Sequence, residues 1–175
     1  MFDLFEFPAD GSGLRRAFAN FPSGVVAICA DVDGTPHGLA VSTFVPVSLD
    51  PPLVSFCVQN SSSTWPKLAG ASHLGLSLLG TDQQDAAQAL GARNGDRFRA
   101  SQLHRGTGGA VFLDGASAWI EGVPEVTVPA GDHAVVILRI HRIATQPEVD
   151  PLVFHGSRYR RLHADTADTW ERKAG

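Results

Sequence analysis

The chain lacks most features that would direct it to a membrane, a nucleic acid or an oxidising compartment. Its 175 residues include only two cysteines, Cys29 and Cys57, and both lie in apolar runs, which favours reduced core thiols over a disulfide. It has no run of about 18 apolar residues, and MFDLFEFPAD at its start does not resemble a signal peptide. A net charge of −4 argues against the diffuse positive field that nucleic acid or anionic lipid requires. We expect a soluble, cytoplasmic protein with one domain over residues 1–175.

Motifs for metal, hydrolase and dinucleotide chemistry are also missing. The sequence has no H-E-x-x-H or C-x-x-C, and roughly 27 Å of extended chain separates His133 from His141, too far for one metal ion. The segments GASHL at Ser72 and GASAW at Ser117 lack the second glycine of a nucleophile elbow. The GTGG that begins at Gly106 lacks the G-x-G-x-x-G spacing and a surrounding βαβ unit, so we expect a loop there.

The sequence does contain a dense β pattern between residues 37 and 58. It predicts strands over 37–47 and 53–58, joined by a turn at 48–52 with the sequence SLDPP. Alternation in the first strand places mostly small side chains, Gly38, Ala40 and Ser42, on one face. Small side chains allow a flat ligand to lie close to the backbone. They equally accommodate a neighbouring strand or helix, and the pattern alone leaves both interpretations open.

The rest of the chain predicts further strands and helices. We expect helices over 14–21 and 81–92, the second capped by Thr81 or Asp82, and a short helix near Trp170. The predicted strands cover 25–30, 73–79, 116–121, 133–143 and 152–160, with a proline-marked connection at 123–130. We expect the last strand to close the sheet. Its basic residues Arg158, Arg160 and Arg161 fit a solvated strand edge or a phosphate contact.

Hydroxyl side chains are concentrated in QNSSSTWPKL, residues 59–68, directly before a predicted helix. Such residues cap helices, and a proline in the first turn is tolerated because its missing N–H would be unpaired there. The same geometry directs free backbone N–H groups and the positive end of a helix outward, which favours an anion. With Lys67 close by, the segment also fits a ligand phosphate.

Taken together, these segments resemble the flavin reductase family, split-barrel flavin-binding proteins that supply reduced flavin to two-component monooxygenases. The resemblance covers about residues 14–162. Its motifs, in order, are FPSGV from Phe21, GLAVSTF from Gly38, VSLDPPLV from Val47, NSSST from Asn60, GDRF from Gly95, GDH from Gly131 and PLVFHGSRY from Pro151. It implies a mainly β fold with peripheral helices, a Greek-key split β-barrel. The family usually has a proline and then a leucine where Val111, Phe112 and Leu113 stand, and often a cysteine where Gly122 stands. These departures affect local loop shape.

The resemblance also implies where a flavin binds. The isoalloxazine ring would lie against Ala40, Val41, Ser42 and Thr43. The ribityl chain and phosphate would contact the hydroxyl-rich segment and the strand end before it, namely Cys57, Val58, Gln59, Asn60, Ser61, Ser62, Ser63 and Thr64.

Other motif residues would complete the same site. Arg97 would lie on the phosphate side and Ser23 near the ring, while Phe154, Gly156 and Tyr159 would shape the pocket. His133 is the candidate catalytic residue, which would contact the nicotinamide or offer a proton near the reduced flavin. The alternative for His133 is a histidine at a strand start, bonded to a backbone carbonyl.

The family's reaction needs no protein nucleophile. Hydride passes directly from C4 of NAD(P)H to N5 of FAD or FMN, with NADH the expected co-substrate over NADPH, so the protein's task is to hold the two rings about 3 to 3.5 Å apart. A neutral His133 should be sufficient for hydride transfer, since this step does not change the number of protons on the imidazole. We expect a homodimer that passes reduced flavin to a separate monooxygenase. The alternatives are an electron carrier or flavin store without turnover of free flavin, and a split-barrel oxidase for a pyridoxal-type phosphate.

Overall fold

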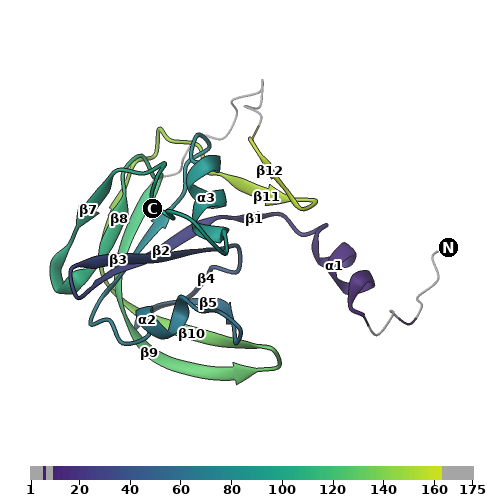
Figure 1. Cartoon of the computed structure of the whole chain (residues 1–175), viewed down its shortest axis with the longest axis horizontal. Coiled ribbons are helices and arrows are strands. Elements are labelled where there is room, and N and C mark those ends of the chain that lie inside the picture. The colour runs from purple at the N-terminus through teal and green to yellow at the C-terminus, as the bar shows by residue number, and fades with distance from the viewer. Residues whose placement is uncertain (1–5, 7–9, 163–175) are drawn as a thin grey trace.

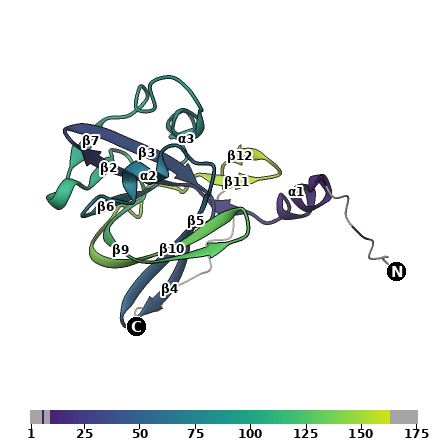
Figure 2. The same cartoon turned by 60° about the horizontal axis from the view of Figure 1, so that its bottom comes forward.

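The computed structural model describes residue 6 and residues 10–162, and an antiparallel seven-stranded sheet makes up most of its body (Figure 1). The strand order is β3-β2-β6-β9-β10-β5-β4. The strands are β2 (Val26–Val32), β3 (Thr35–Val41), β4 (Val45–Leu49), β5 (Pro52–Gln59), β6 (Leu74–Leu78), β9 (Ala118–Ala130) and β10 (His133–Thr145). Figure 2 shows the sheet curling, so that β9 and β10 pass beneath β2 and β3. The expected mainly β fold with peripheral helices is confirmed.

Shorter elements surround this sheet. One small sheet contains β1 (Ser23–Gly24), β11 (Val153–His155) and β12 (Arg158–Arg160), and a hairpin contains β7 (Leu103–Arg105) and β8 (Val111–Leu113). The helices are α1 (Ser12–Phe18), α2 (Trp65–Leu68), α3 (Gln84–Gly91) and the 3₁₀ turn η1 (Thr107–Gly109). None of the helices described within residues 10–162 has the length and hydrophobicity needed to cross a membrane.

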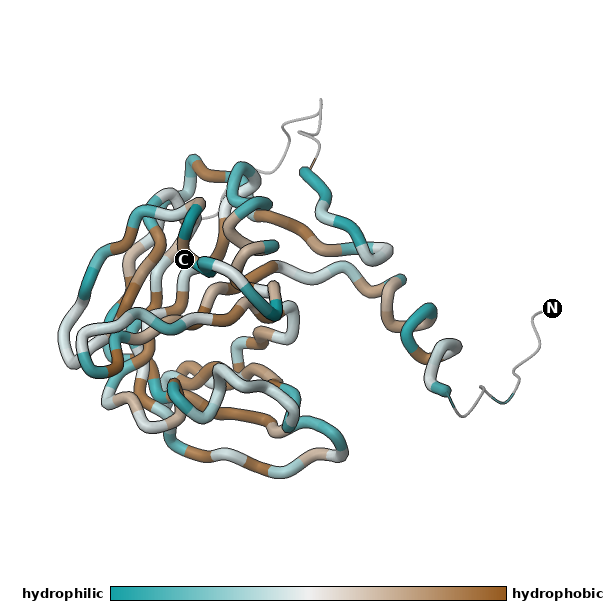
Figure 3. Tube along the Cα trace, viewed as in Figure 1, coloured by the Kyte–Doolittle hydropathy of each residue, from teal (hydrophilic) through white to brown (hydrophobic). Residues whose placement is uncertain are grey.

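The core consists of two hydrophobic clusters on the two faces of β2. Ile28, Phe56 and Leu138 belong to the cluster on one face, and Cys29 and Leu90 belong to the cluster that α3 covers on the other. Figure 3 shows the hydrophobic stretches of the chain gathered in the strands of the body. Because β2 is buried on both faces from Val26 to Ala30, this part of its sequence is continuously apolar rather than alternating. Burial raises the pKa of the Cys29 thiol, as expected for a core cysteine.

Residues 37–47 do not form the single strand that the sequence predicts. Strand β3 ends at Val41 and β4 begins at Val45. Between them, the Thr43 hydroxyl accepts a hydrogen bond from the backbone N of Cys57 at 2.9 Å and donates one to its carbonyl at 3.2 Å. A side chain thus replaces the backbone ladder at this point, which an alternating pattern does not reveal. The predicted hairpin over 48–52 is confirmed, since β4 pairs with β5.

Two other strand predictions were wrong. The expected connection at 123–130 belongs to β9, which pairs with β10 as far as Ala130. Its prolines are tolerated because β6 pairs only with the first part of β9, up to Gly122, which leaves the other edge of 123–130 outside the β6 ladder. Residues 152–160 do not close the main sheet. They form a β11–β12 hairpin that pairs with β1, because Gly156 and Ser157 have positive φ and reverse the chain.

The smaller predictions had mixed outcomes. Helix α3 begins at Gln84 after Gln83, so neither Thr81 nor Asp82 caps it; the Gln83 side chain instead accepts a hydrogen bond from the Gly80 N–H. The loop expected at 106–109 contains the short turn η1. The predicted helix near Trp170 lies outside the described residues.

Candidate functional site

A cleft of about 740 Å³ opens where the end of β3 faces the end of β5. This volume lies within the range of small-molecule sites, roughly 300 to 1,000 Å³. The cleft brings together most residues that the family resemblance implied, namely Ala40, Val41, Ser42, Thr43, Cys57, Val58, Gln59, Ser61, Ser62, Ser63, Thr64, Arg97 and His133. Segments that are far apart in sequence therefore converge on one site. Its apolar run placed Cys57 in the core and the resemblance placed it at the flavin; the residue is half-buried and lines this cleft, so the first prediction was wrong.

One wall of the cleft was not predicted from the sequence. It is the end of α3 and the chain after it, Leu90, Gly91, Ala92 and Arg93. Helix α3 reaches β3 because Gly38 has no side chain: a Cβ there would lie 2.9 Å from Cδ2 of Leu90 and 2.9 Å from Cζ of Phe98. At Gly38, then, the small face of β3 accommodates the protein's own helix. Ala40 and Ser42 are the residues of that face that line the cleft. The alanine-rich apolar face of α3 was the sequence feature that could have predicted the packing of this helix against β3.

Arg97 joins this wall to the sheet. Its Nη1 donates hydrogen bonds to the carbonyl of Gly38, at 3.4 Å, and to the carbonyl of Leu90. A cation is favourable at the C-terminal end of a helix, where the last carbonyls lack helical partners. Arg97 therefore positions α3 against β3 while it lines the cleft. The exposed Arg93 on the same wall adds a second positive charge.

The hydroxyl-rich segment forms the opposite side. The Ser62 hydroxyl accepts a hydrogen bond from the Trp65 N–H, the first N–H of α2, at 3.1 Å. The N-cap residue, Thr64, makes no side-chain cap hydrogen bond, so the segment satisfies a helix N–H from a position before the expected cap. Helix α2 is only one turn long and offers little helix dipole to an anion. Ser61 and Ser63 are exposed in the lining, so their hydroxyls are open to a ligand.

Five predicted residues lie outside the cleft lining. Asn60 fastens the end of β5 to the β9–β10 turn, with its Nδ2 donating to the Gly131 carbonyl at 3.2 Å and its backbone N to the Asp132 carbonyl at 2.9 Å. The other four belong to the β1–β11–β12 sheet or its turn: Ser23, Phe154, Gly156 and Tyr159. The rings of Phe154 and Tyr159 pack edge to face with centroids 5.4 Å apart. Their contact with a bound flavin stays a prediction.

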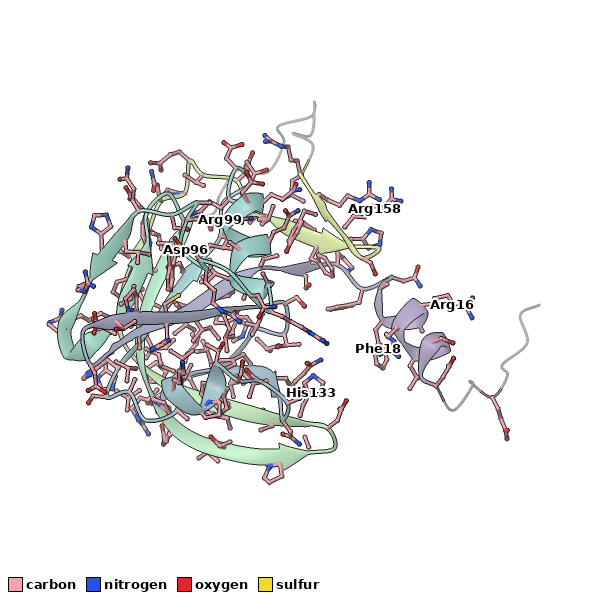
Figure 4. All side chains as sticks on the ribbon, viewed as in Figure 1. Arg16, Phe18, Asp96, Arg99, His133 and Arg158 are labelled. Carbon is pink, nitrogen blue, oxygen red and sulfur yellow. The ribbon has the colours of Figure 1, made fainter. Side chains whose placement is uncertain are left out.

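His133 begins β10 at the cleft and faces the side of the body that carries α1 (Figure 4). Its Nδ1 lies 2.7 Å from Oδ1 of Asp132, and its side chain is 34% exposed. The partner is thus a carboxylate and not the backbone carbonyl of the alternative interpretation. The hydrogen bond to His133 holds the pKa of Asp132 below its ordinary value. With Nδ1 as the donor to this carboxylate, Nε2 is the free ring nitrogen. In the described part of the chain, no group of three His, Cys, Asp or Glu side chains is placed to hold a metal ion.

Comparison with known proteins identifies the family to which the chain belongs. A family model described as the flavin reductase like domain matches residues 18–163. The chain belongs to the flavin reductase family. It is 32% identical to the actinorhodin polyketide dimerase of Streptomyces coelicolor over 155 residues, covering 88% of both proteins. It is 31% identical to a flavin reductase of Pseudomonas putida over 158 residues, covering 90% of this chain and 93% of the relative.

Solved structures agree with this assignment. The NADH:FAD oxidoreductase of Streptomyces globisporus C-1027, in complex with NAD and FAD fragments, superposes on this flavin reductase family member with a TM-score of 0.88 at 28% identity. The match covers 94% of this chain and 100% of that one. The family resemblance, the oxidoreductase class and the split-barrel fold expected from the sequence are confirmed. Flavin and NADH, expected as cofactor and co-substrate, are named together for this solved relative.

Proposed function

We propose that the protein reduces free FAD or FMN with NADH or NADPH and releases the reduced flavin in the cytoplasm to a separate monooxygenase. The observation that carries this proposal is the cleft between β3, the hydroxyl-rich segment and α3. Its donor set suits a phosphorylated flavin, because hydroxyls of Ser61 and Ser63 face the same opening as the cations Arg93 and Arg97. The chain from residue 1 to 175 would act as one flavin-reductase-like domain.

The residues of the cleft position reactants and need not react themselves. When both are bound, the nicotinamide supplies a hydride to N5 of the flavin. Ala40 and Ser42 leave the floor low enough for a flat ring, and their backbone can hydrogen-bond its polar edge. The Thr43 hydroxyl ties the end of β3 to Cys57, which keeps the floor and the phosphate side at a fixed separation. Fixed geometry of this kind lowers the barrier of a two-substrate step.

His133 suits a contact with the nicotinamide. The Asp132 carboxylate holds the imidazole through Nδ1, so that Nε2 can accept a hydrogen bond from the carboxamide N–H of the nicotinamide. Such a bond would orient the nicotinamide over the flavin ring without changing the charge of His133. The residue would then act in binding and orientation of the second substrate.

Anaerobic mixing of the purified protein with each flavin and each nicotinamide tests the function. We expect repeated turnover of excess FAD or FMN, seen as loss of the oxidised flavin absorbance, because a substrate flavin must exchange freely. No turnover in any of the four combinations would overturn the proposal. Reduction that stops after one protein-bound flavin would support the electron carrier or store instead.

We further propose a homodimer with the flavin clefts near its interface. Edge strand β4 exposes Val45, Val47 and Leu49, and the Leu49 side chain is 96% exposed. Helix α1 has no buried residue, and Phe18 is exposed where α1 projects from the body (Figure 4). An isolated helix of this length is marginal in water, and an exposed apolar edge strand invites pairing. A second copy of the chain would cover both.

Analytical ultracentrifugation of a Leu49→Glu protein tests the dimer. We expect the wild-type protein to sediment as a dimer and Leu49→Glu to shift toward monomer, because the substitution places a charge in an apolar contact. The matched control is Leu162→Glu, since Leu162 is also an exposed leucine but lies outside β4. A monomeric wild-type protein, or equal effects of the two substitutions, would contradict this interface.

A further inference from the structure

A second cleft is lined in part by the β7–β8 hairpin. Figure 1 shows this hairpin on the side of the molecule opposite α1. The cleft measures about 400 Å³ and is lined by Gly106, Phe112, Trp119, Glu121 and Arg142, among others. It shares no lining residue with the cleft proposed for flavin. Arg142 stands nine positions after His133 in β10, which corresponds to roughly 30 Å of extended strand. An inference about this cleft is therefore independent of the proposed function.

The unusual group in this cleft is a buried carboxylate. Glu121 is only 5% exposed, yet the one cation at ion-pair distance from it among the described residues is His73, whose Nε2 is 3.9 Å from Oε1. The same Oε1 accepts a hydrogen bond from the Thr107 hydroxyl at 2.8 Å. No donor within residues 10–162 makes a hydrogen bond to Oε2. Oε2 is not among the fully buried atoms that lack a partner in this part of the chain, so it is open to the cleft, where a donor from outside the chain can reach it.

A glycine keeps the space beside Oε2 open. A Cβ at Gly106 would lie 3.2 Å from Oε2 of Glu121 and 2.7 Å from Cε2 of Phe112. Gly106 has a φ of −88°, which any residue can adopt, so the backbone does not require glycine here. What a side chain would remove is the free volume next to the carboxylate.

The walls and rim of the cleft indicate which groups a ligand would carry in addition to the donor that meets Glu121. The Trp119 indole N–H donates to the Leu113 carbonyl at 2.7 Å, so its ring offers an apolar surface and no free donor. Phe112 supplies a second aromatic surface. At the rim, Arg105 is paired with Asp31 at 2.9 Å, whereas Arg142 has no ion-pair partner among residues 10–162. The unpaired guanidinium favours an anionic group on the outer end of a ligand.

We propose that this cleft binds a single-ring aromatic acid that carries a hydroxyl or amino group. The donor on the ring meets Oε2 of Glu121, the ring lies against Trp119 and Phe112, and the acid group faces Arg142. Each part of the ligand corresponds to one unsatisfied or exposed group of the cleft. Planar aromatic surfaces contribute beyond their buried area when they pack against aromatic side chains.

Isothermal titration calorimetry of the full-length protein with 4-hydroxybenzoate and 4-aminobenzoate tests the proposal. We expect one molecule of each to bind per chain. Benzoate lacks the donor and phenol lacks the acid, so each should bind about tenfold more weakly. Gly106→Ala, which crowds Oε2, and Arg142→Gln, which removes the rim charge, should each weaken 4-hydroxybenzoate by about tenfold.

Controls separate this site from the flavin cleft and from general effects of charge. Arg160→Gln removes an exposed strand arginine elsewhere and should leave 4-hydroxybenzoate binding unchanged. Saturating FMN should not displace the acid, and flavin reduction by the Arg142→Gln protein should equal that of the wild type. Absence of binding by either acid would overturn the proposal, as would displacement by FMN. Binding that is indifferent to Arg142→Gln would show adventitious association only, even if Gly106→Ala proved too unstable to measure.

Discussion

A Ser42→Trp protein should bind FAD and FMN about 100-fold more weakly than the wild type, or worse. Ser42 follows the last residue of β3, is exposed, and lines the cleft beside Ala40. An indole at this position would fill the volume that the tricyclic ring needs, and the backbone behind it would no longer be accessible. The fold should survive, because Ser42 belongs to neither hydrophobic cluster. Titration of flavin fluorescence with protein measures the change in affinity.

The matched control for this substitution is Ser72→Trp. Ser72 is also an exposed serine just outside a strand, but it does not line the cleft. It should therefore retain wild-type flavin affinity and turnover, with both proteins compared by circular dichroism for folding. If Ser42→Trp bound flavin as tightly as Ser72→Trp, the ring would lie somewhere other than on β3. That result would remove the structural basis of the proposed function while leaving the family membership intact.

Sequence patterns predicted strands best where local hydrophobicity and turn residues determine them. The continuous apolar run of β2 and the β4–β5 hairpin were anticipated because local patterns determine them. The extent of β9 was not, since prolines usually end strands and their tolerance depends on which edge of 123–130 is free. Which edge of residues 123–130 is free depends on the order of the strands in the sheet, which the local sequence does not reveal. The pairing of 152–160 with β1 likewise depends on a partner about 130 positions earlier in the chain.

The site was predictable to the extent that its motifs were recognisable. Motif resemblance indicated the β3 floor and the hydroxyl-rich segment, which the structure brings together in one cleft. The α3 wall was not foreseen, because its position depends on the contact of Leu90 and Phe98 with Gly38, a glycine that seemed available to a ligand. The two hydrogen bonds from Arg97 to carbonyls of β3 and α3 were hidden for the same reason. Long-range contacts of this kind leave no periodic signal in one sequence.

The His133→Ala protein should lose NADH-dependent turnover about tenfold or more while keeping nearly wild-type affinity for flavin. His133 lines the cleft at the start of β10, and its free Nε2 is the group placed to hold the second substrate. Removing it should raise the KM for NADH and lower kcat, since both binding and alignment of the nicotinamide would suffer. Anaerobic stopped-flow kinetics at saturating flavin measure the loss, and equilibrium titration measures flavin affinity.

Asp132 provides the means to separate orientation from direct contact. Its carboxylate holds Nδ1 of His133 at 2.7 Å, and its pKa is lowered from the ordinary 3.8, so this bond persists through neutral pH and weakens only as the pH falls through the lowered pKa. Asp132→Ala should therefore reduce turnover less than His133→Ala, because the imidazole remains but is less well oriented. Equal loss of flavin affinity and turnover in His133→Ala would mean that the residue only supports the end of β10. A contact between His133 and the nicotinamide instead requires that His133→Ala lose much more turnover than flavin affinity.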